Sequence, residues 1–283
     1  MKHVILASAL IAIFGAAQAQ TVPPFNSVGN TTSDLPDNQA PLRVGGATLT
    51  GFHGPLDAPG IGFNDSSRPD GYYIISLQSI NNFSANGSVS SAGKIFNQYR
   101  LNGYAHAGNP PTGPAISTNF NWGKVNASAR QVYYGIATDH ADSKPTRVDT
   151  AFEVGDNIGF VVPVAKTEYA AAGFVALASR AASVAPTTLT GTLTLEANYQ
   201  SLHGELARTD GTGGLEISAN NINATAGTFD GTSHYTNTAL GYIIDGTTKG
   251  HFYSSGDTSS LAGVASGSNS ADSFVASFGA TKK

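Results

Sequence analysis

The stretch TLTGTLTLEANY, residues 188–199, alternates apolar and polar residues with the two-residue period of a β-strand. Its apolar positions are Leu189, Leu193, Leu195, Ala197 and Tyr199. GLEISA (214–219) repeats the pattern, and ALGYIIDG, GHFYSS, LAGVAS and SFVASF continue it at short, turn-linked spacing. About eight such strands joined by hairpins predict a small up-and-down β-barrel over residues 186–283.

The chain ahead of this barrel is also expected to be β-rich. It contains many of the 33 Gly and 13 Pro of the 283-residue sequence, and these residues separate runs of aromatic and β-branched side chains. We therefore expect an all-β protein with an N-terminal handle (ligand-binding) domain over residues 45–185, followed by the barrel. The predicted strands of the handle cover residues 71–80, 94–106, 129–138, 149–154 and 157–164.

The segment between the two expected domains has no clear period. YAAAGFVALASRAASVA, residues 169–185, fits neither the helical nor the strand template. It predicts either a short helix packed on a sheet or a strand that ends in a linker. VAPTT, residues 184–188, indicates a hinge, and we place the domain boundary there.

The first 19 residues indicate a secretory signal peptide. An apolar run over residues 4–14 follows a charged start, and Ala17-Gln18-Ala19 matches a cleavage site. Residues 20–44 are polar and Pro-rich, which predicts a flexible N-terminal segment. The sequence has no cysteine, so we expect neither a disulfide nor a lipid anchor, and we expect a soluble, exported product.

Composition and motifs exclude several classes of function. Only 12% of the residues are charged and the net charge is −4, whereas a nucleic-acid partner calls for a basic stripe. No G-x-S-x-G or H-E-x-x-H motif occurs, so the sequence gives no support to an enzyme. We expect a monomeric protein that binds a ligand and does not bind nucleic acid.

The last part of the chain carries a recognisable pattern. Phe229-Asp230-Gly231 is followed by GHFY at 250–253, by LAGV at 261–264 and by the ending FVASFGATKK at 274–283. This order and spacing resemble the C-terminal barrel of the transferrin-binding protein B family. The chain departs from the family pattern at Ser254, Ser260 and Ala262.

Within that superfamily, the expected arrangement of one handle domain, one barrel and a cleavable signal peptide is most similar to the hemophilins. Residues 129–138 resemble their handle region more weakly. The resemblance implies a hemophore, secreted from a Gram-negative bacterium through an outer-membrane Slam-type translocon. It would take up heme, with host heme proteins as one source, and deliver it to an outer-membrane TonB-dependent receptor. Alternatives are a binding protein for a corrinoid, another metal compound or a host protein, and an adhesin.

The residues that could hold heme iron are few. Proteins use His, Met, Cys or Tyr for this purpose, and the sequence has no Cys and only the initiator Met. Heme b would therefore be bound non-covalently through His or Tyr. We predict His140 and His53 as the axial pair, with His106 in reserve, although a lone loop histidine is more often a solvated polar residue. Phe52, Tyr133 and Tyr134 would bury the porphyrin, and His203, His234 and His251 are expected to be structural.

Overall fold

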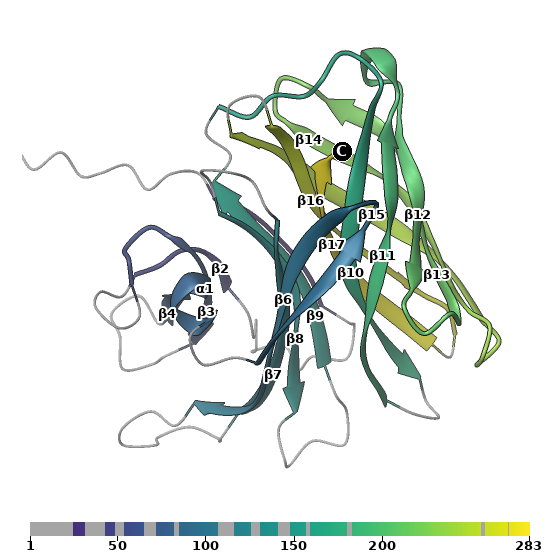
Figure 1. Cartoon of the computed structure of the whole chain (residues 1–283). Coiled ribbons are helices and arrows are strands. Elements are labelled where there is room, and N and C mark those ends of the chain that lie inside the picture. Colours follow the sequence, from purple (N-terminus) through teal and green to yellow (C-terminus); the bar gives the residue numbers. More distant parts are fainter. Residues whose placement is uncertain are drawn as a thin grey trace, which may run out of the picture.

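The computed structural model of the chain contains almost only β-strands (Figure 1). It describes residues 25–31, 43–48, 54–64, 72–81, 85–106, 116–125, 131–140, 148–156, 159–179, 183–255, 258–270 and 272–283. The expected signal peptide, residues 1–19, lies outside these ranges. The strands form a closed barrel, a six-stranded sheet and a three-stranded sheet, which confirms the all-β prediction. Among the described residues, no helix is long and apolar enough to span a bilayer.

The barrel has eight antiparallel strands, as the alternating pattern predicted. Each strand pairs with the next, and the last closes on the first. Its interior holds Leu189, Leu193, Leu195, Leu215 and Ile217, as the apolar pattern predicted. In contrast to that pattern, Ala197 and Tyr199 lie beyond β11, in the short 3-10 helix Ala197–Tyr199. The strands are β10 (Thr167–Ser179), β11 (Ser183–Leu195), β12 (Leu202–Arg208), β13 (Gly213–Asn223), β14 (Thr228–Asn237), β15 (Tyr242–Ser255), β16 (Thr258–Ser268) and β17 (Asp272–Lys282).

The first barrel strand, β10, is the segment whose period was unclear. The barrel thus begins at Thr167, well before residue 186, and residues 184–188 lie within β11 and not in a linker. Strand β10 is buried on both faces, so it has no polar side to mark a two-residue period. Tyr169, Ala171, Val175 and Leu177 point into the barrel, whereas Ala170, Ala172, Phe174 and Ala176 face the neighbouring sheet.

The six-stranded sheet lies against the outside of the barrel (Figure 1). Strand β6 has the predicted bounds, and β1 lies within the segment expected to be flexible. In contrast to the predicted strand over 157–164, the described residues 159–166 form no strand, and Val161 and Val164 are exposed. In order, the sheet contains β1 (Phe25–Thr31), β9 (Val148–Asp156), β8 (Val132–His140), β7 (Ile116–Val125), β6 (Lys94–His106) and β5 (Ala85–Ser91).

The three-stranded sheet packs on the other face of the six-stranded sheet. It consists of β2 (Arg43–Gly46), β3 (Pro59–Asn64) and β4 (Tyr72–Ser76), followed by the single-turn helix α1 (Leu77–Ile80). The predicted strand over 71–80 therefore stops at Ser76, whose hydroxyl caps α1 by accepting from the Gln78 N–H at 3.2 Å. Ile61, Ile75 and Leu77 pack against Trp122 and Phe152 of the larger sheet. The six-stranded sheet is thus the middle of three layers.

Small residues bring the six-stranded sheet close to the barrel wall. The ring of Tyr134 on β8 lies against Gly123 on β7 and Gly279 on β17. A Cβ added at Gly123 would be 2.2 Å from a carbon of this ring, and a Cβ added at Gly279 would be 2.4 Å from one. Ala170, Ala172 and Ala262 line the barrel side of the same contact. This buried apolar layer fixes the sheet on the barrel.

Candidate functional site

The histidines predicted to bind iron lie at the edge of what the structure describes. His53, like Phe52, falls outside the described residues. His106 is the last residue of β6 and His140 is the last residue of β8, and the structure describes only the backbone of these two residues. In the backbone register, His106 is opposite Ile116 and His140 is opposite Ser117, which are consecutive residues of β7. The two histidine positions are therefore at the same end of the sheet, with one strand between them, and they lie on opposite faces of the sheet because consecutive residues of a strand alternate.

The two tyrosines predicted to cover the porphyrin are core residues. Tyr133 and Tyr134 are fully buried on opposite faces of β8, Tyr133 toward the three-stranded sheet and Tyr134 toward the barrel. The Tyr133 hydroxyl donates to Oε1 of Gln131 at 2.9 Å, and the Tyr134 hydroxyl accepts from Nε2 of Gln98 at 3.4 Å. Burial raises the pKa of both phenols. The structure does not bring the two rings into one pocket.

Two of the barrel histidines make only local contacts. His234 Nδ1 lies 2.7 Å from Oδ1 of its cross-strand neighbour Asp245, and His203 lies beside Ser201 and Glu196. Within the described ranges, no group of three or more His, Asp or Glu side chains could hold a metal ion. The side chains of His53, His106 and His140 are outside those ranges.

The third barrel histidine belongs to a buried polar cluster between the barrel and the sheet. Glu153 on β9 is fully buried, and its carboxylate faces β15 of the barrel. His251 Nδ1 is hydrogen-bonded to Glu153 Oε1, and the Tyr253 hydroxyl donates to Glu153 Oε2 at 2.6 Å. Burial raises the pKa of the Glu153 carboxyl, and the hydrogen bonds from His251 and Tyr253 oppose that rise.

This cluster joins the two units and was not predicted from sequence. Burying a carboxylate is costly unless hydrogen bonds satisfy its oxygens, and both oxygens of Glu153 have a partner. The one signal in the sequence is a single acidic residue within the otherwise apolar run AFEV, residues 151–154. Nothing in that run identifies partners about 100 residues further along the chain.

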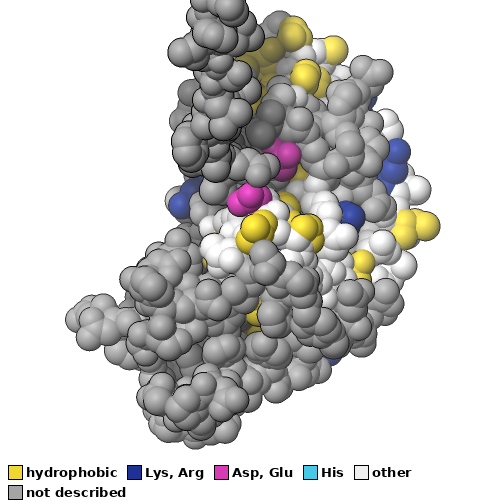
Figure 2. All heavy atoms as spheres, turned by 90° about the vertical axis from the view of Figure 1, so that its left-hand side faces the viewer, with side chains coloured by type: hydrophobic (Ala, Val, Ile, Leu, Met, Phe, Trp, Pro, Cys, Tyr) yellow, Lys and Arg dark blue, Asp and Glu magenta, His cyan; other side chains and the backbone are white. Residues whose placement is uncertain are grey.

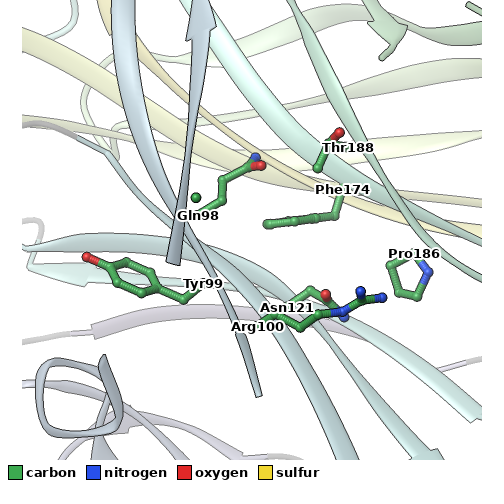
Figure 3. Close-up of a pocket in the computed structure, with 8 residues that line it drawn as sticks. Gln98, Tyr99, Arg100, Asn121, Phe174, Pro186 and Thr188 are labelled. Atoms are coloured by element: carbon green, nitrogen blue, oxygen red, sulfur yellow. The ribbon is translucent and has the colours of Figure 1, made fainter. Parts of the chain in front are cut away.

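A pocket of about 300 Å³ opens at the junction of the sheet and the barrel (Figure 3). Its floor is formed by the face of the sheet that carries Gln98, Arg100 and Asn121 on β6 and β7. Phe174 on β10 and Pro186 on β11 form the barrel wall. The remaining lining residues are Gly87, Tyr99 and Thr188; the Tyr99 ring points away from the space and stacks on Trp122 at 5.4 Å.

On the face that carries the three-stranded sheet, the described side chains form no large patch of one kind (Figure 2). Figure 2 shows the side that carries the three-stranded sheet, where the described hydrophobic side chains are scattered and the described charged ones are few. Ile95 is exposed without another large exposed apolar residue near it in the described sequence, and single exposed apolar residues are common on protein surfaces.

No protein-family profile matches the sequence, and no curated protein matches it significantly. Among solved structures, the chain is similar to intact Ap-TbpB with its N and C lobes, at a TM-score of 0.40 and 12% identity over 71% of this chain and 38% of that chain. It is also similar to isotype 1 transferrin-binding protein B from serogroup B Neisseria meningitidis, at a TM-score of 0.41 and 12% identity over 86% of this chain and 51% of that chain. The chain thus spans about half of one of these proteins and 38% of the other.

Proposed function

We propose that the protein is a secreted hemophore, which captures heme outside the cell and delivers it to an outer-membrane TonB-dependent receptor after export by a Slam-type translocon. The observation that carries this proposal is the backbone position of His140 at the end of β8, at the same end of the six-stranded sheet as His106 but on the opposite face. Histidine and tyrosine are the only iron ligands that the sequence offers beyond Met1. The resemblance of residues 227–283 to the barrel of transferrin-binding protein B supports the export and receptor-binding roles.

In this proposal, each part of the handle has a separate task. Neutral imidazoles of His140 and His53 bind the iron, with His106 in reserve, and Phe52 covers the porphyrin. Because Tyr133 and Tyr134 are fully buried in two packed layers, we assign them to holding β8 in place and thereby fixing the position of His140. The barrel serves secretion and receptor docking and takes no part in holding heme.

Titration with hemin tests the proposal directly. The purified protein should develop a Soret band with saturation at one hemin per chain. His140→Ala should change the low-spin spectrum to that of a five-coordinate iron, and a second substitution, at His53 or His106, should remove most of the binding. Binding should also weaken as pH falls through the titration range of imidazole, about 6.5 for a free side chain.

His203→Ala is the matched control, because its side chain is 48% exposed on the barrel and distant from the proposed ligands in sequence. It should leave the hemin spectrum unchanged. The proposal is wrong if the protein stays colourless with hemin, which would favour another ligand or an adhesive role. The assignment of the iron ligands is wrong if substitution of His53, His106 and His140 in turn leaves the hemin spectrum unchanged.

A further inference from the structure

We propose that the pocket at the junction of sheet and barrel is a second binding site, for a small organic carboxylate that also carries a hydroxyl or amine donor and an apolar group. At about 300 Å³ it has the size of the smallest ligand pockets, which span roughly 300–1,000 Å³. Its floor is polar and its barrel wall is apolar, and each part contributes a separate requirement on the ligand.

The first requirement comes from a buried oxygen without a partner. Gln98 is only 6% exposed, and within the described part of the chain its Oε1 accepts no hydrogen bond. The orientation of the amide is fixed, because Nε2 is 3.4 Å from the Gly173 carbonyl, which can only accept. Figure 3 shows the amide turned toward the space near Phe174 and Thr188. A ligand O–H or N–H would satisfy this oxygen, whose burial otherwise costs stability.

The second requirement comes from a cation beside it. Arg100 lies two residues after Gln98 on β6 and so on the same face, directly opposite Asn121 on β7. Arg100 is exposed, and among the described residues it has no carboxylate partner. A guanidinium presents a planar fork that matches a carboxylate. Figure 3 shows Arg100 extended along the pocket toward Pro186.

The third requirement comes from the barrel wall. The pairing of β10 with β11 shifts between Val175 and Leu177, next to Pro186, and a bulge of this kind bends the strand and interrupts its pairing locally. Pro186 precedes Leu189, where pairing with β12 begins. At this bend, the Phe174 ring and Pro186 form an apolar surface that faces the polar floor of the pocket. This apolar surface suits a ring or a branched alkyl group on the ligand.

This site is distinct from the proposed heme site. His106 is six positions beyond Arg100 on the same strand, which corresponds to about 20 Å of extended chain. The inference does not depend on heme binding, and the substitutions that test the two proposals are different.

Three matched small molecules test the inference: 3-phenyllactate, 3-phenylpropionate, which lacks the hydroxyl, and 3-phenyllactamide, which lacks the charge. Ligand-observed NMR and isothermal titration calorimetry with the full mature chain should show binding of 3-phenyllactate. Each of the other two should bind at least ~10-fold more weakly, as expected for the loss of one hydrogen bond or one charge-assisted pair.

Protein variants locate the binding. Arg100→Gln and Gln98→Met should each weaken 3-phenyllactate binding by ~10-fold or more. Lys94→Gln is the matched control, because it removes a positive charge from the same strand outside the pocket, and it should have no effect. Circular dichroism will confirm that all three variants are folded. Absence of 3-phenyllactate binding at millimolar concentration overturns the inference, as does equal binding by the parent chain and the Arg100 and Gln98 variants.

Discussion

The hydrogen bond from Tyr253 to Glu153 should be among the strongest contacts between the barrel and the six-stranded sheet. Tyr253→Phe removes only the hydroxyl, which lies 2.6 Å from Glu153 Oε2, and both residues are fully buried. A hydrogen bond to a charged group contributes about 1.5–3 kcal/mol to stability. The substitution leaves the Glu153 carboxylate with His251 as its remaining side-chain partner, so we expect a loss of this size.

Tyr169→Phe is the matched control for this experiment. Tyr169 is also a fully buried barrel tyrosine, but its hydroxyl is bonded to the neutral hydroxyl of Ser259 at 2.9 Å. A neutral hydrogen bond contributes about 0.5–1.5 kcal/mol. Tyr169→Phe should therefore destabilise the protein less than Tyr253→Phe does. In a Glu153→Gln background the cost of Tyr253→Phe should fall to the neutral range, because the acceptor no longer carries a charge.

Urea unfolding measures these differences. Trp122 is the single tryptophan; it is fully buried in the six-stranded sheet, and its Nε1 donates to Asn81 at 2.9 Å, so its fluorescence reports on that sheet. With a slope of about 3 kcal/mol per M, the expected loss for Tyr253→Phe lowers the urea midpoint by about 0.5–1 M. Equal losses for the two tyrosine variants, or no coupling between Tyr253 and Glu153 in the double-mutant cycle, would refute the reasoning.

Two further predictions concern the same contact layer. Gly123→Ala should lower stability by about 1–3 kcal/mol in thermal or urea unfolding, because its Cβ would lie 2.2 Å from the buried Tyr134 ring. Gly87→Ala, in the same row of the sheet but with nothing within 4 Å, should stay within about 0.5 kcal/mol, and equal effects would contradict the packing. Burial raises the pKa of the Glu153 carboxyl above its ordinary 4.5, so the folded state binds the carboxyl proton more tightly than the unfolded state does. Protonation of Glu153 therefore adds to the unfolding free energy below pH 4.5, and this added stability is lost as pH rises through the raised pKa. The unfolding free energy of the parent chain relative to Glu153→Gln should therefore be larger at pH 5 than at pH 8; a difference that grows with pH would show the opposite sign.

The barrel could be predicted from sequence wherever its strands have one polar face. Leu215 and Ile217 alternate with polar residues and lie inside the barrel, as expected. Strand β10 lacks this alternation, because one face packs in the barrel and the other against the sheet. Its start could not be placed from periodicity, and the predicted boundary at residues 184–188 followed from the proline and not from the packing.

The candidate sites were less predictable, for a different reason. Gln98 and Arg100 are ordinary polar residues of a strand, and only the approach of β10 and β11 makes them the floor of a pocket. Glu153 is a lone acidic residue in an apolar strand until β15 supplies its partners. Each site depends on contacts between residues far apart in the chain, and a one-strand pattern carries no information about such contacts.

The segment GHFY, residues 250–253, shows how one short strand can serve both units. Phe252 points into the barrel, where its ring meets Phe229 edge-on at 5.5 Å, and a Cβ at Gly250 would lie 2.5 Å from that same Phe229 ring. His251 and Tyr253 point outward to Glu153. Alternation along β15 thus assigns one pair of positions to the barrel core and the other to docking of the six-stranded sheet. A substitution at Phe252 should therefore act first on the barrel, whereas one at Tyr253 should act first on the contact between barrel and sheet.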